Sequence, residues 1–296
     1  MHSRSLRRPR LRMIVAGLIV ALVATFVFWP AKEDRQPSYI ADKTYKLTII
    51  NTNGLMAEKN PAKRSNQLTQ RQMLISFIRS EVEADGGKLF LLSGGELGGD
   101  DLLNHHNQLG YHAMTASPQF FSEPMNTIRL KQTAADFPFL SANLYESETG
   151  MPIFDAYALF DVDGLRIAVM GVTQPTSFAA VNGKHQQGIE LMDPGLSAAE
   201  IVPSLRNQAD IIIATTHPAY QNNTNTGLHT VPGIDLIIGN SLLDNIRQIS
   251  NISRLNEPDC HSTIDRIDVE FRNGELKKTN SVTINLCNNQ IKPEFC

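Results

Sequence analysis

The sequence lacks the short motifs that mark several large enzyme classes. It contains no G-x-S-x-G of a serine hydrolase, no H-E-x-x-H of a zinc protease and no P-loop. It also has no internal repeat and no low-complexity segment, which excludes solenoid proteins and long disordered chains. The sequence therefore offers no catalytic motif of these three kinds.

Basic residues are scarce beyond the first twelve positions. The chain has 27 Lys and Arg against 30 Asp and Glu, but five arginines stand at its start: Arg4, Arg7, Arg8, Arg10 and Arg12. The rest of the chain therefore carries 22 basic against 30 acidic residues, a formal charge of −8. Because binding to a phosphate backbone requires a basic face, nucleic acid is not an expected partner.

Only one long apolar run is present, from Met13 to Trp29, and it contains no charged residue. Its length is at the short end for a transmembrane helix, and the arginines before it favour a cytoplasmic N-terminus. The sequence thus predicts a basic stub (1–12), a signal anchor (13–29), a tether (30–43) and a domain (44–296) outside the cytoplasm. The alternative is a cleaved signal peptide, for which Ala21–Ala24 is a poor cleavage site.

Beyond the tether, apolar runs typical of strands alternate with helical patterns, which indicates an α/β layered domain. One helix is expected over 69–84, with Thr69 and Gln72 as a capping box. Its expected apolar stripe consists of Met73, Leu74, Phe77, Ile78 and Val82. Ser197 and Glu200 are expected to cap another helix, with Pro203 in its first turns. The remaining expected elements are a helix over 101–109 and strands over 46–50, 88–92, 137–142, 158–162, 165–172, 210–214 and 235–238.

Cysteine is limited to Cys260, Cys287 and Cys296. Asn273-Gly274 separates two alternating runs, 262–271 and 276–286, which predicts a hairpin with a two-residue turn. Such a turn pairs residues whose numbers sum to 547, so Cys260 would face Cys287. Because disulfides persist in oxidising compartments, we expect a Cys260–Cys287 bridge in preference to one between Cys287 and Cys296.

Eight segments, taken in order, resemble the 5′-nucleotidase branch of the calcineurin-like metallophosphoesterases. They are KLTIINTNGLMA (46–57), LFLLSGGELGGD (89–100), NQLGYHAMTASPQFFSEP (107–124), FPFLSANL (137–144), the strand 165–173, DIIIATTHPAY (210–220), GIDLIIGNSL (233–242) and RIDVEFRNGELK (266–277). The resemblance implies a four-layer α/β/β/α sandwich, here preceded by one transmembrane helix. It also implies a site for two divalent metal ions at the strand ends, which would hydrolyse phosphate esters.

The positions that this resemblance assigns to metal ligands are mostly substituted. The first-motif ligands fall on Gly54 and Met56, the second-motif aspartate on Glu96, the Asn-His pair on Pro118 and Gln119, and the last two histidines on Asn240 and Leu242. Only His217 stands where the family has a ligand. Since Glu96 and His217 alone make a poor metal site, we expect no bound metal and no catalytic residue. What remains is a vestigial pocket of Asn53, Gly54, Met56, Glu96, Gln119, His217 and Asn240.

Other titratable groups stand near these motifs, including Asp100, Asp101, His105, His106 and His112. The sequence favours a solvated helix N-terminus here, with the two aspartates stabilised by the helix dipole, over a rebuilt metal site. The family's C-terminal domain, which carries the nucleotide-stacking aromatics, is also expected to be absent.

Three functional hypotheses remain open. The first is a non-catalytic interaction or scaffolding module of the cell envelope, anchored in the inner membrane with an envelope protein as its partner. The second is a divergent phosphoester hydrolase that uses Glu96 and His217. The third is a sensor that binds a small ligand in the vestigial pocket.

Overall fold

The computed structural model describes residues 37–53, 60–95, 100–175, 186–216, 227–239 and 263–286. The chain divides after Gln36 into two units, and all described residues belong to the second. The predicted anchor, Met13–Trp29, lies outside the described residues. Within the described ranges no helix is both long and apolar enough to span a membrane.

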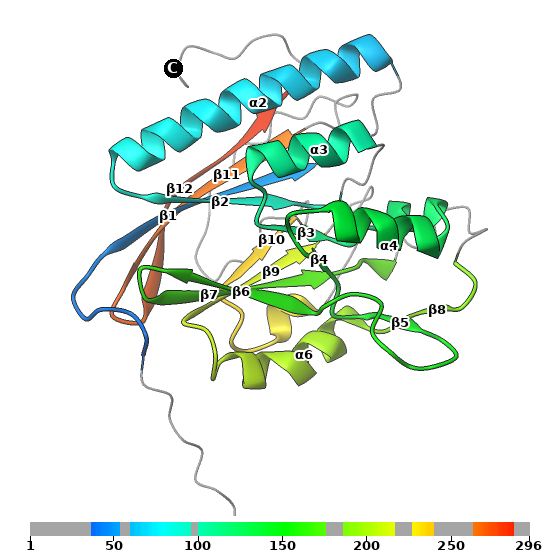
Figure 1. Cartoon of the computed structure of the whole chain (residues 1–296). Helices are drawn as coiled ribbons and strands as arrows, with labels where there is room; N and C mark the ends of the chain where they lie inside the picture. Colours follow the sequence, from blue (N-terminus) through cyan, green and yellow to red (C-terminus); the bar gives the residue numbers. More distant parts are fainter. Residues whose placement is uncertain are drawn as a thin grey trace, which may run out of the picture. The chain divides into compact units, whose positions relative to one another are not determined.

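Two sheets lie at the centre of the domain (Figure 1). The larger has the order β12-β11-β1-β2-β3-β4, and the smaller has the order β10-β9-β7-β6. The larger is built from β1 (Tyr45–Asn53), β2 (Lys88–Ser93), β3 (Ala113–Thr115), β4 (Phe139–Leu140), β11 (Thr263–Arg272) and β12 (Glu275–Asn285). The smaller is built from β6 (Tyr157–Val162), β7 (Leu165–Val172), β9 (Ile211–Thr216) and β10 (Leu236–Ile238). A separate pair joins β5 (Leu144–Glu146) to β8 (Ile189–Leu191).

Helices cover the outer face of each sheet (Figure 1). α2 (Pro61–Ala84), α3 (Asp100–Leu109), η2 (Pro118–Ser122) and α4 (Met125–Ala134) pack on the larger sheet, and α6 (Pro194–Leu205) packs on the smaller. A short turn, η3 (Leu228–Thr230), lies beside α6. Three hydrophobic cores separate the four layers, so the predicted α/β/β/α order is confirmed.

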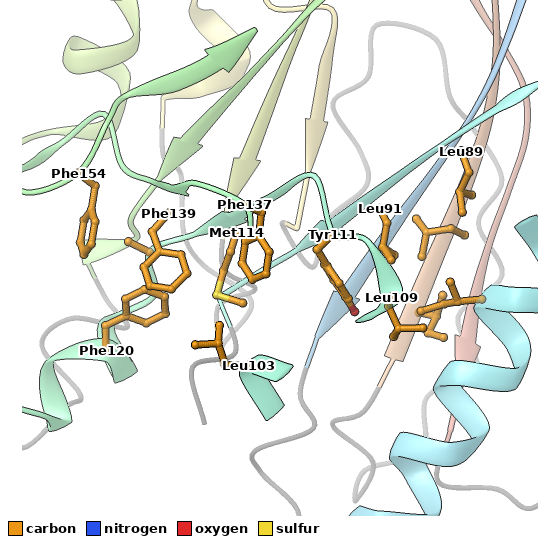
Figure 2. Close-up of a cluster of buried hydrophobic side chains, with 14 of the residues drawn as sticks. Leu89, Leu91, Leu103, Leu109, Tyr111, Met114, Phe120, Phe137, Phe139 and Phe154 are labelled. Carbon is orange, nitrogen blue, oxygen red and sulfur yellow. The ribbon is translucent and has the colours of Figure 1, made fainter. Parts of the chain in front are cut away.

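The strands of this sandwich are apolar on both faces because each face meets another layer. On β1, Ile50 packs under the helices, whereas Ile49 packs between the sheets. On β7, Val169 belongs to the core between the sheets and Met170 to the core under α6. Figure 2 shows the core under α2 and α3, with Leu89, Leu91 and Leu109 at one end and the rings of Phe120, Phe139 and Phe154 at the other.

The helix expected over 69–84 begins eight residues earlier than predicted. Asn60 is its N-cap and accepts hydrogen bonds at Oδ1 from Ala62 N (3.0 Å) and Lys63 N (3.3 Å). Thr69 lies inside the helix and donates to Ser65 O, so the predicted capping box is wrong. The predicted stripe is correct for Leu74, Ile78 and Val82, but Met73 and Phe77 are exposed.

The second predicted cap is also wrong. Asp193 caps α6 by accepting from Leu196 N at 2.8 Å, and Ser197 is the fourth residue of the helix. Pro203 therefore lies in the last turn of α6, where few following residues depend on an unbroken hydrogen-bond ladder. The strand expected over 137–142 is reduced to Phe139–Leu140.

The hairpin at Asn273-Gly274 is confirmed, but its register changes along the strands. Arg272 pairs with Glu275, and both turn residues have positive φ (49° and 85°), as a type I′ turn requires. A β-bulge between Asp268 and Val269 then shifts the pairing by one residue, so that Asp268 faces Asn280. The register argument for Cys260–Cys287 therefore fails beyond the bulge. Both cysteines lie outside the described residues, and the bridge itself stays a prediction.

Candidate functional site

The parallel strands of both sheets end at the same edge of the sandwich, where open α/β sheets usually bind ligands. In the larger sheet β1, β2, β3 and β4 run parallel, and in the smaller sheet β7, β9 and β10 do so. Buried polar residues gather at these ends: Asn51, Thr52, Asn53, Ser93, Thr115, Ser117, Ser141, Asn143, Thr173, Gln174, Thr215 and Thr216. All of them carry hydroxyl or amide groups, and none carries a carboxylate or an imidazole.

Hydroxyl groups connect the two sheets directly at this edge. Thr115 Oγ1 lies 2.7 Å from Thr215 Oγ1, and Thr215 Oγ1 also donates to Met170 O at 3.2 Å. Thr173 Oγ1 donates to Ala116 O at 2.7 Å. These bonds hold the end of β3 against the ends of β7 and β9 with no intervening group.

Amide side chains complete the network on the smaller sheet. Asn143 donates to Thr173 O (2.9 Å) and accepts from Thr173 N (2.9 Å), while Gln174 Nε2 donates to Thr216 Oγ1 (3.1 Å). Gln174 Oε1 is buried and accepts no hydrogen bond in the described part of the chain. Most of the hydrogen-bonding capacity at this edge is therefore used within the protein.

The loop after β2 approaches the loop after β3 so closely that it requires glycine. Gly95 has a φ of 108°, and a Cβ there would lie 2.4 Å from Ser117 Cβ and 2.6 Å from Thr115 O. Ser117 Oγ donates to Gly95 O at 2.5 Å. Any side chain at residue 95 would have to displace the end of β3.

The structure places two of the seven predicted pocket residues. Asn53 is buried at the end of β1, and its Nδ2 donates to Asp265 Oδ2 at 3.4 Å. Gln119 lies in η2 with an exposed side chain, next to the buried Pro118. The other predicted pocket residues lie outside the described ranges: Gly54, Met56, Glu96, His217 and Asn240. Leu242 lies outside them as well.

A buried basic group that the sequence reasoning missed lies beneath the end of β1. Arg71, on the inner face of α2, is fully buried, and its Nη2 donates to Asn53 O at 3.3 Å. Arg71 shares the buried face of α2 with Leu74, Ile75 and Ile78. A charged residue at a position where the helical pattern predicts an apolar one was the sequence feature that could have revealed it.

The two histidines of α3 differ in exposure. His105 is half-buried, whereas His106 is buried, with its ring 4.3 Å from that of Tyr111. Burial, the positive charge of Arg71 and the neighbouring His105 hold the pKa of His106 well below its ordinary value. Burial, and to a smaller extent Arg71, also lowers the pKa of His105. The ring of His112 stacks on Phe90, and its Nδ1 accepts from Leu91 N at 3.1 Å.

Asp265 on β11 is a second group that the sequence reasoning missed. Thr283 Oγ1 donates to its Oδ1 at 2.7 Å, and burial raises the pKa of its carboxyl. Asp265 stands at the next position of the inward-facing alternation formed by Ile267, Val269 and Phe271. An acidic residue where this alternation predicts an apolar one was the sequence feature that could have revealed it. Within the described residues, no three His, Cys, Asp or Glu side chains lie close enough together to hold a metal ion.

Comparison with known proteins gives relatives of one kind, although no family model matches the sequence. The 5′-nucleotidase of Vibrio cholerae is 30% identical over 93% of this chain and 56% of that protein. Protein UshA of Escherichia coli is 29% identical over 91% of this chain and 56% of that protein. The chain thus spans little more than half the length of these relatives.

Solved structures share the fold. The calcineurin-like phosphoesterase YfkN of Bacillus subtilis has a TM-score of 0.58 at 18% identity, covering 84% of this chain and 93% of that chain. The sulfate thiohydrolase SoxB of Thermus thermophilus has a TM-score of 0.59 at 19% identity, covering 74% of this chain and 42% of that chain.

Proposed function

The chain is homologous to bacterial 5′-nucleotidases and shares the fold of the calcineurin-like phosphoesterases, and from this relationship we propose that it is a non-catalytic, membrane-anchored member of the group. In this proposal the domain lies outside the cytoplasm and acts as an interaction module with an envelope protein. The fold is kept, whereas hydrolysis by two metal ions is not.

The observation that carries this proposal is the substitution of the positions to which the resemblance assigns metal ligands, and the uncharged network around Thr115 and Thr215 agrees with it. A two-metal site needs several carboxylates and imidazoles converging on ions about 3.5–4 Å apart. The described strand ends instead bring hydroxyls and amides into contact with one another, with 2.7 Å between the two threonine oxygens. Such a network stabilises the junction of the two sheets, and the two threonines supply no charge.

The substitutions at the motif positions support the same conclusion. Gly54 has no side chain, while Met56, Pro118 and Leu242 carry side chains with no oxygen or nitrogen ligand for a hard cation. Glu96 and His217 would leave at most two ligands, and a two-ligand site is readily stripped of its ion.

The place of action is proposed from the N-terminal sequence. Five arginines followed by an uncharged apolar run favour an N-terminus in the cytoplasm and a domain on the other side of the inner membrane. A second candidate function is that of a divergent phosphoester hydrolase. It is favoured by the relatives in Vibrio species, several of which are named 5′-nucleotidases.

Metal content separates the two candidates. The full chain, purified in detergent without chelators, is analysed for manganese, iron, cobalt and zinc beside the double variant Glu96→Ala, His217→Ala. We expect far less than one of these ions per chain, with no difference between the two proteins. A content near one or two ions per chain that the double variant loses would favour the hydrolase.

A thermal-shift series tests the remaining possibility, a small-ligand sensor. A ligand that binds the folded state raises the unfolding temperature in a concentration-dependent way. We expect no shift with nucleotides or sugars. A saturable shift that is lost in Asn53→Ala would replace the interaction module with a ligand sensor.

A further inference from the structure

Oxygen-bearing side chains share one face of β1, β11 and β12. Asn51 on β1 faces Asp265 on β11, and Asp265 faces Thr283 on β12. Directly opposed residues point to the same side of a sheet, and Asn53, two residues after Asn51, points there too. The preceding pair on this face, Ile49 and Ile267, packs between the two sheets. A patch rich in oxygen therefore replaces the apolar core toward the end of β1.

The acid at the centre of this patch has hydrogen-bond donors but no positive charge beside it. Thr283 Oγ1 lies 2.7 Å from Asp265 Oδ1, and Asn53 Nδ2 lies 3.4 Å from Asp265 Oδ2. Burial raises the pKa of Asp265, and the hydrogen bond from Thr283 offsets this only in part. Among the ion pairs of the described residues, none involves Asp265.

The amide oxygens next to this acid are unused. Asn51 Oδ1 and Asn53 Oδ1 are buried and accept no hydrogen bond in the part of the chain that the structure describes. Both residues are almost fully buried, with exposed fractions of 0% and 4%. A buried polar atom without a partner destabilises a fold by about 1–3 kcal/mol, so two such atoms beside an uncompensated carboxyl call for a ligand.

We propose that Asn51, Asn53, Asp265 and Thr283 form a binding site for one calcium ion. The four side chains offer a carboxylate, two amide carbonyls and a hydroxyl, a set made only of hard oxygen ligands. Calcium accepts six to eight such ligands at about 2.3–2.6 Å in flexible geometry, and water fills the remaining positions. Magnesium demands a nearly ideal octahedron at shorter distances, which side chains on three different strands supply less readily.

Binding needs only a local rearrangement of the two amides. A half-turn about the terminal bond of Asn53 exchanges Nδ2 for Oδ1 and directs oxygen toward Asp265 without changing the volume of the side chain. Neither Asn51 Oδ1 nor Asn51 Nδ2 has a hydrogen-bond partner in the described part of the chain, so this amide can direct its oxygen toward the carboxyl without losing a bond. In the ion-free protein, Asn53 Nδ2 donates to Asp265 instead.

The charge of the site sets its affinity. A site with a single carboxylate falls in the weak range of extracellular calcium modules, with a dissociation constant of about 0.1–1 mM.

Equilibrium dialysis of the full chain in detergent against calcium tests the proposal, with thermal unfolding as a parallel readout. We expect one calcium ion per chain, half-saturation between about 0.1 and 1 mM, and a higher unfolding temperature with calcium. Magnesium, and sodium chloride at matched ionic strength, should give a smaller shift or none.

Three variants complete the test. Asp265→Asn keeps the shape of the side chain and should abolish saturable calcium binding, and Asn53→Ala should move half-saturation to higher calcium. The matched control, Asp136→Asn, removes an exposed carboxylate elsewhere and should bind calcium as the wild type does. Absence of saturable binding in the wild type, equal binding by Asp265→Asn, or a preference for magnesium would overturn the assignment. None of these outcomes depends on whether the chain hydrolyses phosphate esters.

Discussion

The hydroxyl oxygens of Thr115 on β3 and Thr215 on β9 lie 2.7 Å apart and join the two sheets at the edge where their parallel strands end. Thr215 Oγ1 also donates to Met170 O and so has two partners, whereas Thr115 Oγ1 has Thr215 as its partner among the described residues. Neither threonine stands at a position to which the phosphoesterase resemblance assigns a metal ligand. The contact stabilises the junction of the two sheets, and the proposed loss of metal chemistry rests on the substituted motif positions.

The Thr115–Thr215 bond should contribute measurably to stability. Thr215→Val leaves the Thr115 hydroxyl and Met170 O without their partner, and we expect it to lower the free energy of unfolding by about 2 kcal/mol. Thr115→Val leaves Thr215 its bond to Met170 O and should cost about 1 kcal/mol. The double variant should cost less than the sum, as chemical denaturation can measure. The exposed Thr133→Val serves as the control. If each single variant lowered the free energy of unfolding no more than this control does, and the two changes were additive, the bond would contribute nothing.

The start of α2 at Asn60 can be tested by comparing two polar residues. Asn60→Ala removes the side chain that caps Ala62 N and Lys63 N, so we expect a loss of about 0.5–2 kcal/mol in the free energy of unfolding. Thr69→Ala acts inside the helix, where alanine is the better helix former, and should be neutral or slightly stabilising. A larger loss at residue 69 than at residue 60 would contradict this helix boundary.

The buried histidine of α3, His106, should make the fold sensitive to acid. The pKa of His106 is lowered in the folded state by burial and by Arg71, so the unfolded chain binds the proton more tightly. Stability should therefore be complete above the ordinary histidine pKa of about 6.5 and fall as pH decreases below it. The lowered pKa values of His105 and His112 act in the same direction.

His106→Phe isolates the contribution of this residue. A phenyl ring fits the aromatic surroundings of Tyr111 and Phe137 and takes up no proton. We expect the slope of unfolding free energy against pH, measured between pH 7 and 5, to decrease by up to about 1.4 kcal/mol per pH unit. The exposed His229→Asn is the control, and an unchanged slope in His106→Phe would mean that His106 is not the acid-sensitive group.

Much of the fold could be predicted because its strands are apolar on both faces and its turns use distinctive residues. The strand Leu165–Val172 has the predicted bounds, and Asn273-Gly274 forms the predicted turn. The first turns of α2 were missed although Asn60-Pro61 is a strong start signal, because those turns are polar and show no apolar stripe. The bulge at Asp268 and Val269 was not predictable, since the alternating pattern continues through it.

The candidate site was predicted in outline only. The motif positions directed attention to the strand ends, and Asn53 indeed lies there in a buried setting. Arg71 and Asp265 were missed because each interrupts an apolar pattern with one charge, which sequence periodicity treats as an exception. Their partners come from other elements, such as Asn53 O for Arg71 and Thr283 for Asp265, and only the folded chain brings these together.

A phosphoesterase assay tests the central claim most directly. The full chain in detergent is incubated with generic phosphate esters and nucleotides in the presence of manganese, cobalt or zinc, beside the double variant Glu96→Ala, His217→Ala. The non-catalytic account predicts the same background rate for both proteins, with no dependence on added metal. Turnover that requires metal and disappears in the double variant would contradict the account and establish a divergent hydrolase.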